Sequence, residues 1–296
     1  GVKKLFGNKE LEKEMAEAGF QFSSANSINI GRLVPQVVYY VYAYAKLLEN
    51  EQIENGEEIN VVVPTGNFGN ILAAYFAKHM GVPIKTLICA SNDNKVLYDF
   101  FTTGTYDRKR EFILTNSPSM DILISSNLER LIYLSTGCDA AADAALMKDL
   151  SEKGSYTVTG NMRQFMSDFR GGFATEAQNE ATIRKIFEDT GYLIDTHTGV
   201  AAAVYGQYRA ESGDHTKTVI ASTASPYKFS NSVMEAIAGP DSVRGRDEFE
   251  VVDALSSLSE VAVPKAVEEI RTAPVRHNLE CDVDRMKDTV KGILKI

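Results

Sequence analysis

The chain of 296 residues is poor in the residues that build metal centres and disulfide frameworks. Its three cysteines, Cys89, Cys138 and Cys281, are widely spaced and odd in number, and they form no C-x-x-C pair. The four histidines show no metal-ligand spacing. We therefore expect no metal site, and we expect free thiols in a reducing compartment, which points to the cytoplasm.

Long apolar runs and positive charge are also scarce. The longest uncharged apolar run, residues 37–45, is about half of what a membrane-spanning helix requires. Lys and Arg number 31 against 40 Asp and Glu, which gives a net charge of −9. Because a nucleic acid needs a basic surface, neither a membrane nor a nucleic acid is an expected partner. An anionic ligand must be held by local groups rather than by the overall field.

The order of the expected elements predicts a layered α/β fold with a mainly parallel sheet. We expect strands at residues 20–24, 59–63, 84–90, 192–195 and 218–222. We expect helices at residues 3–18, 32–49, 71–80, 93–101, 140–152, 176–190, 199–209 and 230–238. Thr175 and Gly191 are expected to cap the sixth of these helices.

The most informative segment is the Gly-rich loop at residues 64–70, which follows a β-branched run and precedes a helix. Gly66 and Gly69 let the backbone turn tightly and approach a ligand closely. The backbone N–H groups of such a loop, together with the helix dipole, suit a phosphate dianion. The alternative is an ordinary turn between strand and helix, in which glycine is common anyway.

A second polar cluster lies at residues 23–32. Asn26, Ser27 and Asn29 supply neutral donors, and Arg32 can hold a carboxylate or a phosphate with two parallel hydrogen bonds. The alternative is that the Ser and Asn side chains cap the next helix while Arg32 forms a surface ion pair. For the Ser and Asn pattern alone, capping is the better interpretation.

Two further segments follow expected strands. Thr223 lies after the strand at 218–222, where ligands of open α/β sheets bind. Lys228 is either an anion contact or a solvated loop lysine. His197 is either an acid–base group or a hydrogen-bonding partner at a helix start.

These segments together resemble threonine synthase, a pyridoxal-phosphate enzyme of the tryptophan-synthase-β-like fold (fold type II). The resemblance rests on residues 24–36, 39–40, 64–70, 127–130, 195–198 and 222–229, and it spans nearly the whole chain. One departure is Ser225, where family members commonly have His.

The resemblance implies a three-layer α/β fold with a mainly parallel, twisted sheet that is incomplete at the N-terminus. Residues 1–240 would form part of the large domain that binds pyridoxal phosphate. Residues 241–296 would form a mostly helical tail packed on the same domain.

The resemblance also assigns binding roles. The residues implied to bind pyridoxal 5′-phosphate are Gly66, Asn67, Phe68, Gly69 and Asn70 at its phosphate and Thr223 at its pyridine nitrogen. The residues implied to hold the substrate's own phosphate are Asn26, Ser27, Asn29 and Arg32. The family converts O-phospho-L-homoserine and water to L-threonine and phosphate.

The family's Schiff-base lysine lies well upstream of the motif at 24–29. Before Asn26 this chain offers Lys3, Lys4, Lys9 and Lys13, all expected on a solvated helix face. We therefore expect no catalytic residue in this chain. We expect a C-terminal part of the enzyme that is inactive by itself and holds no pyridoxal phosphate. The oligomeric state is left open.

Two alternatives remain at this stage. Another fold type II lyase, such as a serine/threonine dehydratase or a cysteine synthase, would lack the cluster at residues 24–29. A non-catalytic module that binds an anion or a cofactor would be excluded by an upstream segment that carries the lysine.

Overall fold

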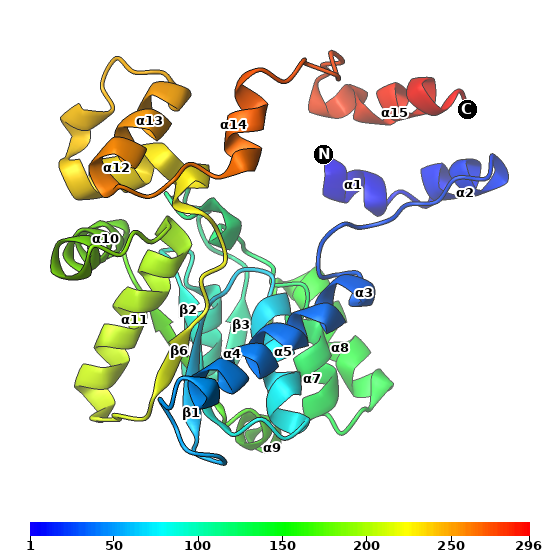
Figure 1. The fold of residues 1–296 in the computed structure, drawn as a ribbon. Coiled ribbons are helices and arrows are strands. Elements are labelled where there is room, and N and C mark those ends of the chain that lie inside the picture. The colour runs from blue at the N-terminus through cyan, green and yellow to red at the C-terminus, as the bar shows by residue number, and fades with distance from the viewer.

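A four-stranded parallel sheet lies at the centre of the molecule, with the strand order β5-β2-β1-β6 (Figure 1). The computed structural model describes residues 1–296, except for the side chain of Lys3. The strands are β1 (Ile59–Pro64), β2 (Ile84–Ser91), β5 (Phe169–Phe173) and β6 (Thr218–Ile220). A separate antiparallel pair consists of β3 (Thr105–Asp107) and β4 (Ser155–Thr157).

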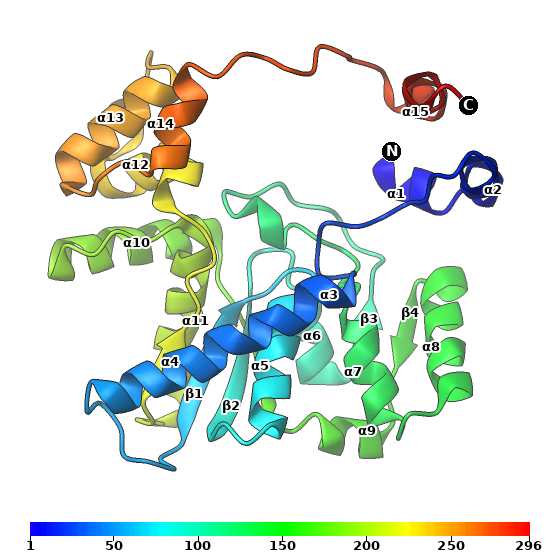
Figure 2. The ribbon, with the colours of Figure 1, turned by 45° about the vertical axis from the view of Figure 1, so that its right-hand side comes forward.

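Both faces of the sheet are covered by helices. Val61 and Val63 of β1 pack into the hydrophobic cluster that includes α4 (Val37–Glu49) and α5 (Gly69–His79). Val62 points to the other face and packs with residues of α11 (Thr196–Ser212). This alternation is the period of a strand, and burial on both faces explains the continuous apolar run. Figure 2 shows α4 and α5 in front of the sheet, which makes the three-layer α/β fold visible.

The remaining helices enclose the ends and sides of these layers. Those on the side of β3 and β4 are α6 (Val96–Thr103), α7 (Leu128–Ser135), α8 (Ala140–Lys153) and α9 (Gly160–Phe165). Helix α10 (Glu176–Thr190) packs on α11, and α12 (Ser230–Ala238) packs on α10. The expected caps of α10 are confirmed: Thr175 forms a capping box with Gln178, and Gly191 ends the helix with a φ of 70°.

The two ends of the chain lie side by side (Figures 1 and 2). After α12, the tail forms α13 (Glu248–Ser259), α14 (Lys265–Arg271) and α15 (Met286–Leu294). Helix α13 packs on α12, whereas α15 lies against α1 (Val2–Phe6) and α2 (Lys9–Glu17). Lys287 and Lys291 of α15 pair with Glu10 and Glu14 of α2 at 2.7 and 2.5 Å.

Several sequence expectations need correction. Residues 20–24 and 192–195 form no strand, and β3, β4 and β5 were not expected. The helix expected at 3–18 breaks before α2, where the Asn8 side chain caps the new helix. The helix expected at 32–49 is divided into α3 (Ile30–Leu33), a 3-10 turn that contains Pro35, and α4. Among the described helices, none is both long and apolar enough to cross a bilayer.

Asp214 fastens the sheet at the amino-terminal ends of its strands. Its carboxylate accepts hydrogen bonds from the Thr216 hydroxyl and backbone N–H, from Tyr208 and from the fully buried Asn60 of β1. Lys85 of β2 lies 3.1 Å away. These hydrogen bonds, those from Thr216 first, hold the pKa of Asp214 far below its usual range. One carboxylate thereby links β1, β2, α11 and the turn before β6.

We expect Asp214→Asn to lower the free energy of unfolding by about 1–3 kcal/mol at neutral pH, because buried donors lose a charged acceptor. A depressed pKa in the folded protein stabilises it above the unfolded-state pKa and less as pH falls through the folded value. The difference in the free energy of unfolding between variant and wild type should therefore narrow as pH falls below about 4. Urea unfolding at several pH values measures it.

Asp189→Asn is the matched control, because Asp189 forms an exposed pair with Lys185 on α10. Its effect should stay below about 0.5 kcal/mol at every pH. An Asp214→Asn effect equally small, or constant with pH, would contradict the role given to this carboxylate.

Candidate functional site

The loop between β1 and α5 presents an unpaired row of backbone donors. Among the described residues, the backbone N–H groups of 66–70 have no hydrogen-bond acceptor. Phe68 is the N-cap of α5 and adopts the left-handed conformation, with a φ of 66°. A left-handed residue before a helix start forms a concave arrangement of N–H groups that binds anions. The loop therefore has the backbone geometry of an anion site.

Several carbonyl groups of this loop accept hydrogen bonds from side chains and from the backbone. The Ser125 hydroxyl donates to Gly66 O at 2.7 Å. Asn127 donates to Asn67 O from its side-chain amide at 2.9 Å and from its backbone N–H at 3.0 Å. The Asn70 side chain donates to Pro64 O at 2.9 Å. Because the carbonyls of Pro64, Gly66 and Asn67 are held by donors, the loop keeps one orientation and its N–H groups stay free.

Both glycines of the loop lie where a side chain would not fit. A Cβ on Gly66 would lie 2.4 Å from the backbone oxygen of Ser119, and one on Gly69 would lie 2.1 Å from Ser27 Oγ. Neither glycine has a positive φ. Close approach, rather than unusual dihedral angles, thus requires glycine at these two positions.

A cavity of about 220 Å³ lies directly at this loop. It brings together residues from five sequence segments, and its lining includes Ser27, Gly66, Asn67, Gly69, Asn70, Ser119, His197, Thr223 and Lys228. The structure therefore brings the loop, one residue of the 23–32 cluster, Thr223, Lys228 and His197 to a single place. The side chain of Phe68 points away into the core, where it is fully buried.

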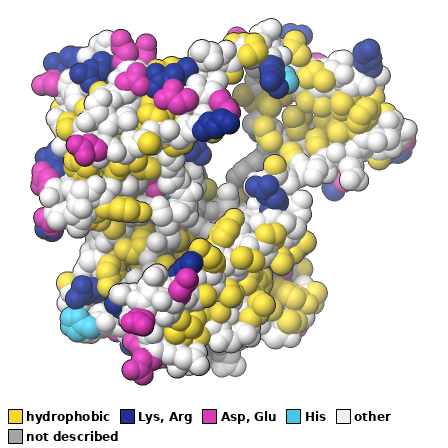
Figure 3. Space-filling view, in the orientation of Figure 1, with side chains coloured by type: hydrophobic (Ala, Val, Ile, Leu, Met, Phe, Trp, Pro, Cys, Tyr) yellow, Lys and Arg dark blue, Asp and Glu magenta, His cyan; other side chains and the backbone are white. Residues whose placement is uncertain are grey.

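A larger hollow of about 940 Å³ adjoins this cavity between α4 and the edge strand β6. Arg32 lines it, and Gln36, Asn70 and Thr223 line both spaces. Arg32 is exposed and forms no ion pair with a described carboxylate, so the expected alternative of a surface ion pair is not realised. Figure 3 shows hydrophobic side chains over the face of α4, which exposes Val38, Tyr39 and Tyr42.

Asn26 and Asn29 are engaged in local turns. Asn26 Oδ1 accepts from the Ile28 N–H at 3.0 Å, and Asn29 Oδ1 accepts from the Gly31 N–H at 3.0 Å as the N-cap of α3. Neither residue lines the two spaces described above. The capping interpretation describes the observed contact of Asn29, whereas Asn26 stabilises the turn that precedes it; for both side chains a role at a ligand stays a prediction.

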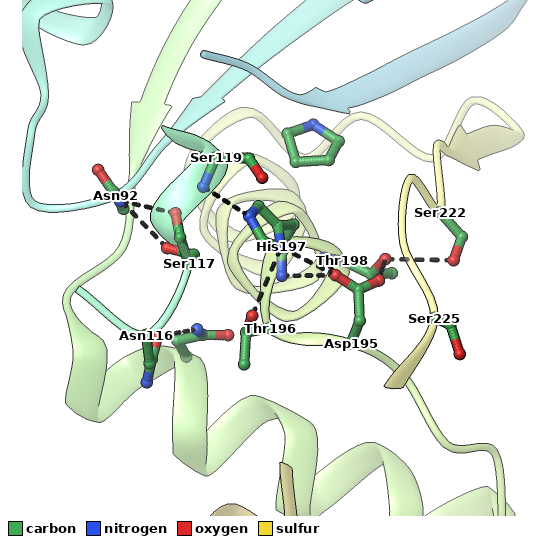
Figure 4. Close-up of polar contacts among 12 residues, drawn as sticks. Asn92, Asn116, Ser117, Ser119, Asp195, Thr196, His197, Thr198, Ser222 and Ser225 are labelled. Atoms are coloured by element: carbon green, nitrogen blue, oxygen red, sulfur yellow. Dashed lines mark hydrogen bonds and ion pairs between the residues drawn. The ribbon is translucent and has the colours of Figure 1, made fainter. Parts of the chain in front are cut away.

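His197 belongs to a buried polar network behind the cavity (Figure 4). Its Nε2 accepts from the Ser119 N–H at 3.1 Å, and its Nδ1 lies 3.2 Å from Asp195 Oδ1. Asp195 is the N-cap of α11. Burial works against its charge, but hydrogen bonds from His197 and Thr198 outweigh it and keep the pKa of Asp195 below its ordinary value. Both predicted uses of His197 remain compatible with this position.

Nucleophilic side chains are few around the cavity. Among the described residues, Lys228 is the one lysine that lines the cavity. Its Nζ lies 5.4 Å from the centre of the Phe229 ring. Lys9 and Lys13 pair with Glu12 and Glu17 on α2. Cys89 lies beneath the loop on β2, and burial raises the pKa of its thiol to about 12. At neutral pH that thiol is protonated and unreactive.

Sequence reasoning missed the residues that fix the loop from outside. Ser119, Ser125 and Asn127 lie about fifty to sixty positions further along the chain than the loop. Asn127 lies within a motif that carried the resemblance, but neither residue type nor spacing indicated that it holds Asn67.

Comparison with known proteins agrees with this architecture. Residues 198–289 match the family described as threonine synthase, C-terminal. Threonine synthase from Saccharomyces cerevisiae is 33% identical over 303 residues, which cover 97% of this chain and 57% of the yeast protein. Human threonine synthase-like 1 is 40% identical over 239 residues, which cover 80% of this chain and 32% of that protein.

Solved structures give the same result. Threonine synthase from Brucella melitensis, determined with pyridoxal phosphate bound, has a TM-score of 0.78 and 32% identity, and the match covers all of this chain and 57% of that one. The yeast threonine synthase structure has a TM-score of 0.78 and 30% identity, again over 57% of its length. The chain thus spans about a third of the human relative and little more than half of the yeast and Brucella proteins. By sequence and fold, it belongs to the threonine synthase family of fold type II pyridoxal-phosphate enzymes and corresponds to the C-terminal portion of its members.

Proposed function

We propose that this chain forms the phosphate-binding part of a threonine synthase, which converts O-phospho-L-homoserine and water to L-threonine and phosphate. The observation that carries the proposal is the cavity in which the free N–H groups of residues 66–70 lie beside Ser27 and Thr223. The similarity to threonine synthases, one of them determined with pyridoxal phosphate bound, supports this choice among anion-binding functions.

The residues present fit the cofactor's phosphate. A dianion at the loop would receive N–H groups that have no described protein acceptor, and the missing Cβ atoms at Gly66 and Gly69 leave the close approach open. Thr223, at the same cavity, would hold the pyridine nitrogen with a neutral hydroxyl. When bound, pyridoxal phosphate supplies the electron sink for removal of protons from the substrate carbon atoms.

The substrate's phosphate would be held where the small cavity meets the adjoining larger hollow. Ser27 lines the small cavity and Arg32 the adjoining hollow, and Gln36 and Asn70 border both. A guanidinium is suited to this task because it offers two parallel donors to one anion. Asn26 and Asn29 would act there by shaping the turn that carries Ser27, since their side chains make local hydrogen bonds.

The chain's own side chains bind and orient, but they do not supply the expected lysine. The described lysines of α1 and α2 lie on a separate pair of helices, and Lys228 enters the cavity from the loop next to Thr223. We therefore propose that turnover needs a lysine-bearing segment that lines the open hollow beside β6. In this proposal Lys228 contacts an anion, and the reaction takes place in the cytoplasm.

We expect the chain by itself, mixed with pyridoxal phosphate and O-phospho-L-homoserine, to release phosphate no faster than a blank. The reason is that no general base of the required kind is placed at the substrate carbon atoms. A phosphate-release assay measures the rate, with yeast threonine synthase as the positive control. Turnover above the blank would contradict the proposal, and its loss in Lys228→Ala would identify Lys228 as the missing lysine.

We expect the loop to bind inorganic phosphate, and we expect Gly66→Ala to weaken that binding at least about tenfold, because the added Cβ meets a backbone oxygen that cannot rotate away. Isothermal titration calorimetry measures the affinity, and circular dichroism checks that the variant is folded. Gly206→Ala is the control, since a Cβ there meets no atom within 4 Å. Equal affinities for Gly66→Ala and wild type would remove the loop from the site.

We expect Arg32→Ala to lower the affinity for O-phospho-L-homoserine by about tenfold or more, because hydrogen bonds to a charged group contribute roughly 1.5–3 kcal/mol. Arg32→Lys should recover part of this loss, since an ammonium cannot make the two-pronged contact. Phosphorus NMR titration gives both affinities. Arg244→Ala, an exposed arginine paired with Asp241, is the control. An unchanged affinity in Arg32→Ala would refute the substrate-phosphate assignment.

A further inference from the structure

Asp195 lies behind the cavity and is linked to both of its walls, which are the phosphate loop (residues 64–70) and the segment that carries Thr223. It is fully buried, and its side chain caps α11 by accepting from the backbone N–H groups of His197 and Thr198. A carboxylate at this position is favoured by the helix dipole. The cap accounts for one part of its hydrogen bonding. The side chains of His197 and Thr198 add a second part, which a helix cap does not require.

The first arm of this network leads to the phosphate loop. Asp195 can only accept hydrogen bonds, so the proton of the imidazole lies on Nδ1, 3.2 Å from Asp195 Oδ1. This tautomer leaves Nε2 as an acceptor, and it receives the Ser119 N–H at 3.1 Å. The carbonyl of Ser119 then lies so close to Gly66 that no Cβ would fit between them. Asp195, His197 and Ser119 thus form the rear support of the loop.

The second arm leads to Thr223. The Thr198 hydroxyl donates to Asp195 Oδ2, the oxygen that His197 does not use. The same hydroxyl oxygen lies 3.2 Å from Ser222 Oγ, and Ser222 directly precedes Thr223. Figure 4 shows the two arms leaving Asp195 in different directions, one toward Ser119 and one toward Ser222.

We propose that Asp195 is a positioning residue that sets the phosphate loop and Thr223 at a fixed separation, through His197 on one side and Thr198 on the other. This inference rests on the proposed function, in which one ligand uses both walls at once. A ligand with a phosphate at one end and a ring nitrogen at the other is sensitive to that separation, whereas inorganic phosphate depends on the loop alone.

The two arms make different predictions, because each can be removed while the backbone cap of α11 stays. His197→Phe removes the acceptor for Ser119, and Thr198→Val removes the hydroxyl without changing the size of the side chain. The probes are inorganic phosphate and pyridoxamine 5′-phosphate, which carries the phosphate and the ring nitrogen and needs no lysine.

We expect His197→Phe to weaken both probes by about tenfold, because a buried N–H loses its acceptor and the loop loses its support. His197→Gln, which can both donate and accept, should recover part of the loss. We expect Thr198→Val to weaken pyridoxamine 5′-phosphate about fivefold and to leave inorganic phosphate within about twofold. Thr182→Val, at a partly exposed threonine on α10 whose hydroxyl donates within the helix, is the control for the loss of a hydroxyl.

Amide hydrogen exchange provides a readout that needs no ligand. The N–H groups of Leu72 and Asn127 donate to carbonyls of the phosphate loop, and the N–H of Lys228 donates to Ser225 O beyond Thr223. His197→Phe should speed exchange at Leu72 and Asn127 and not at Lys228. Thr198→Val should speed exchange at Lys228 and leave it unchanged at Leu72 and Asn127. These patterns report on the two arms separately.

Two results would overturn the positioning role. One is that both variants change both walls equally, in step with a lower melting temperature, which would make the network a general stabiliser. The other is that neither variant changes exchange or affinity. If the wild-type chain binds neither probe, the proposed function fails, and the exchange pattern still decides whether Asp195 positions the two walls.

Discussion

Phe68 holds a φ of 66°, a conformation that a bulky residue adopts only when its surroundings enforce it. Such a residue is strained by about 1–3 kcal/mol. Its ring is fully buried and packs against Phe101 and Phe169, with centroids 6.0 and 5.7 Å away. Burial of a phenylalanine contributes roughly 1.5–3 kcal/mol, which offsets the strain. The aromatic core therefore maintains the turn that leaves the N–H groups of the loop free.

The rest of the loop follows from the same constraint. Once Phe68 turns the chain, the carbonyls of Gly66 and Asn67 meet donors from Ser125 and Asn127. A buried carbonyl without a partner would be unfavourable, so these donors stabilise the one orientation in which the N–H groups face the cavity. The site is thus a property of the tertiary structure, although its binding groups are contiguous in sequence.

The sequence predicts the central part of this architecture because local signals and tertiary packing agree there. A β-branched run, a Gly-rich loop and an apolar helix give β1 and α5 to within two residues. Local signals and tertiary packing disagree at β5, whose Gly171 and Gly172 weaken a strand pattern. The structure needs both glycines, since a Cβ would lie 3.0 Å from Tyr98 Cα and 2.4 Å from a methyl group of Val204. Only the packed fold contains that information. The same is true of Ser119, Ser125 and Asn127, which reach the loop from a distant segment.

An acidic protein that binds anions needs local groups that offset its own repulsive field. With a net charge of −9, the overall field repels a phosphate dianion. At the phosphate loop the donors are backbone N–H groups and a helix terminus, which carry partial positive charge that no titration can remove. The one buried carboxylate close by, Asp195, is turned away from the cavity toward His197, Thr198 and the start of α11. The charge of Asp195 therefore orients neutral protein groups and does not face the ligand. This separation lets a buried anion and an anion site lie within one network.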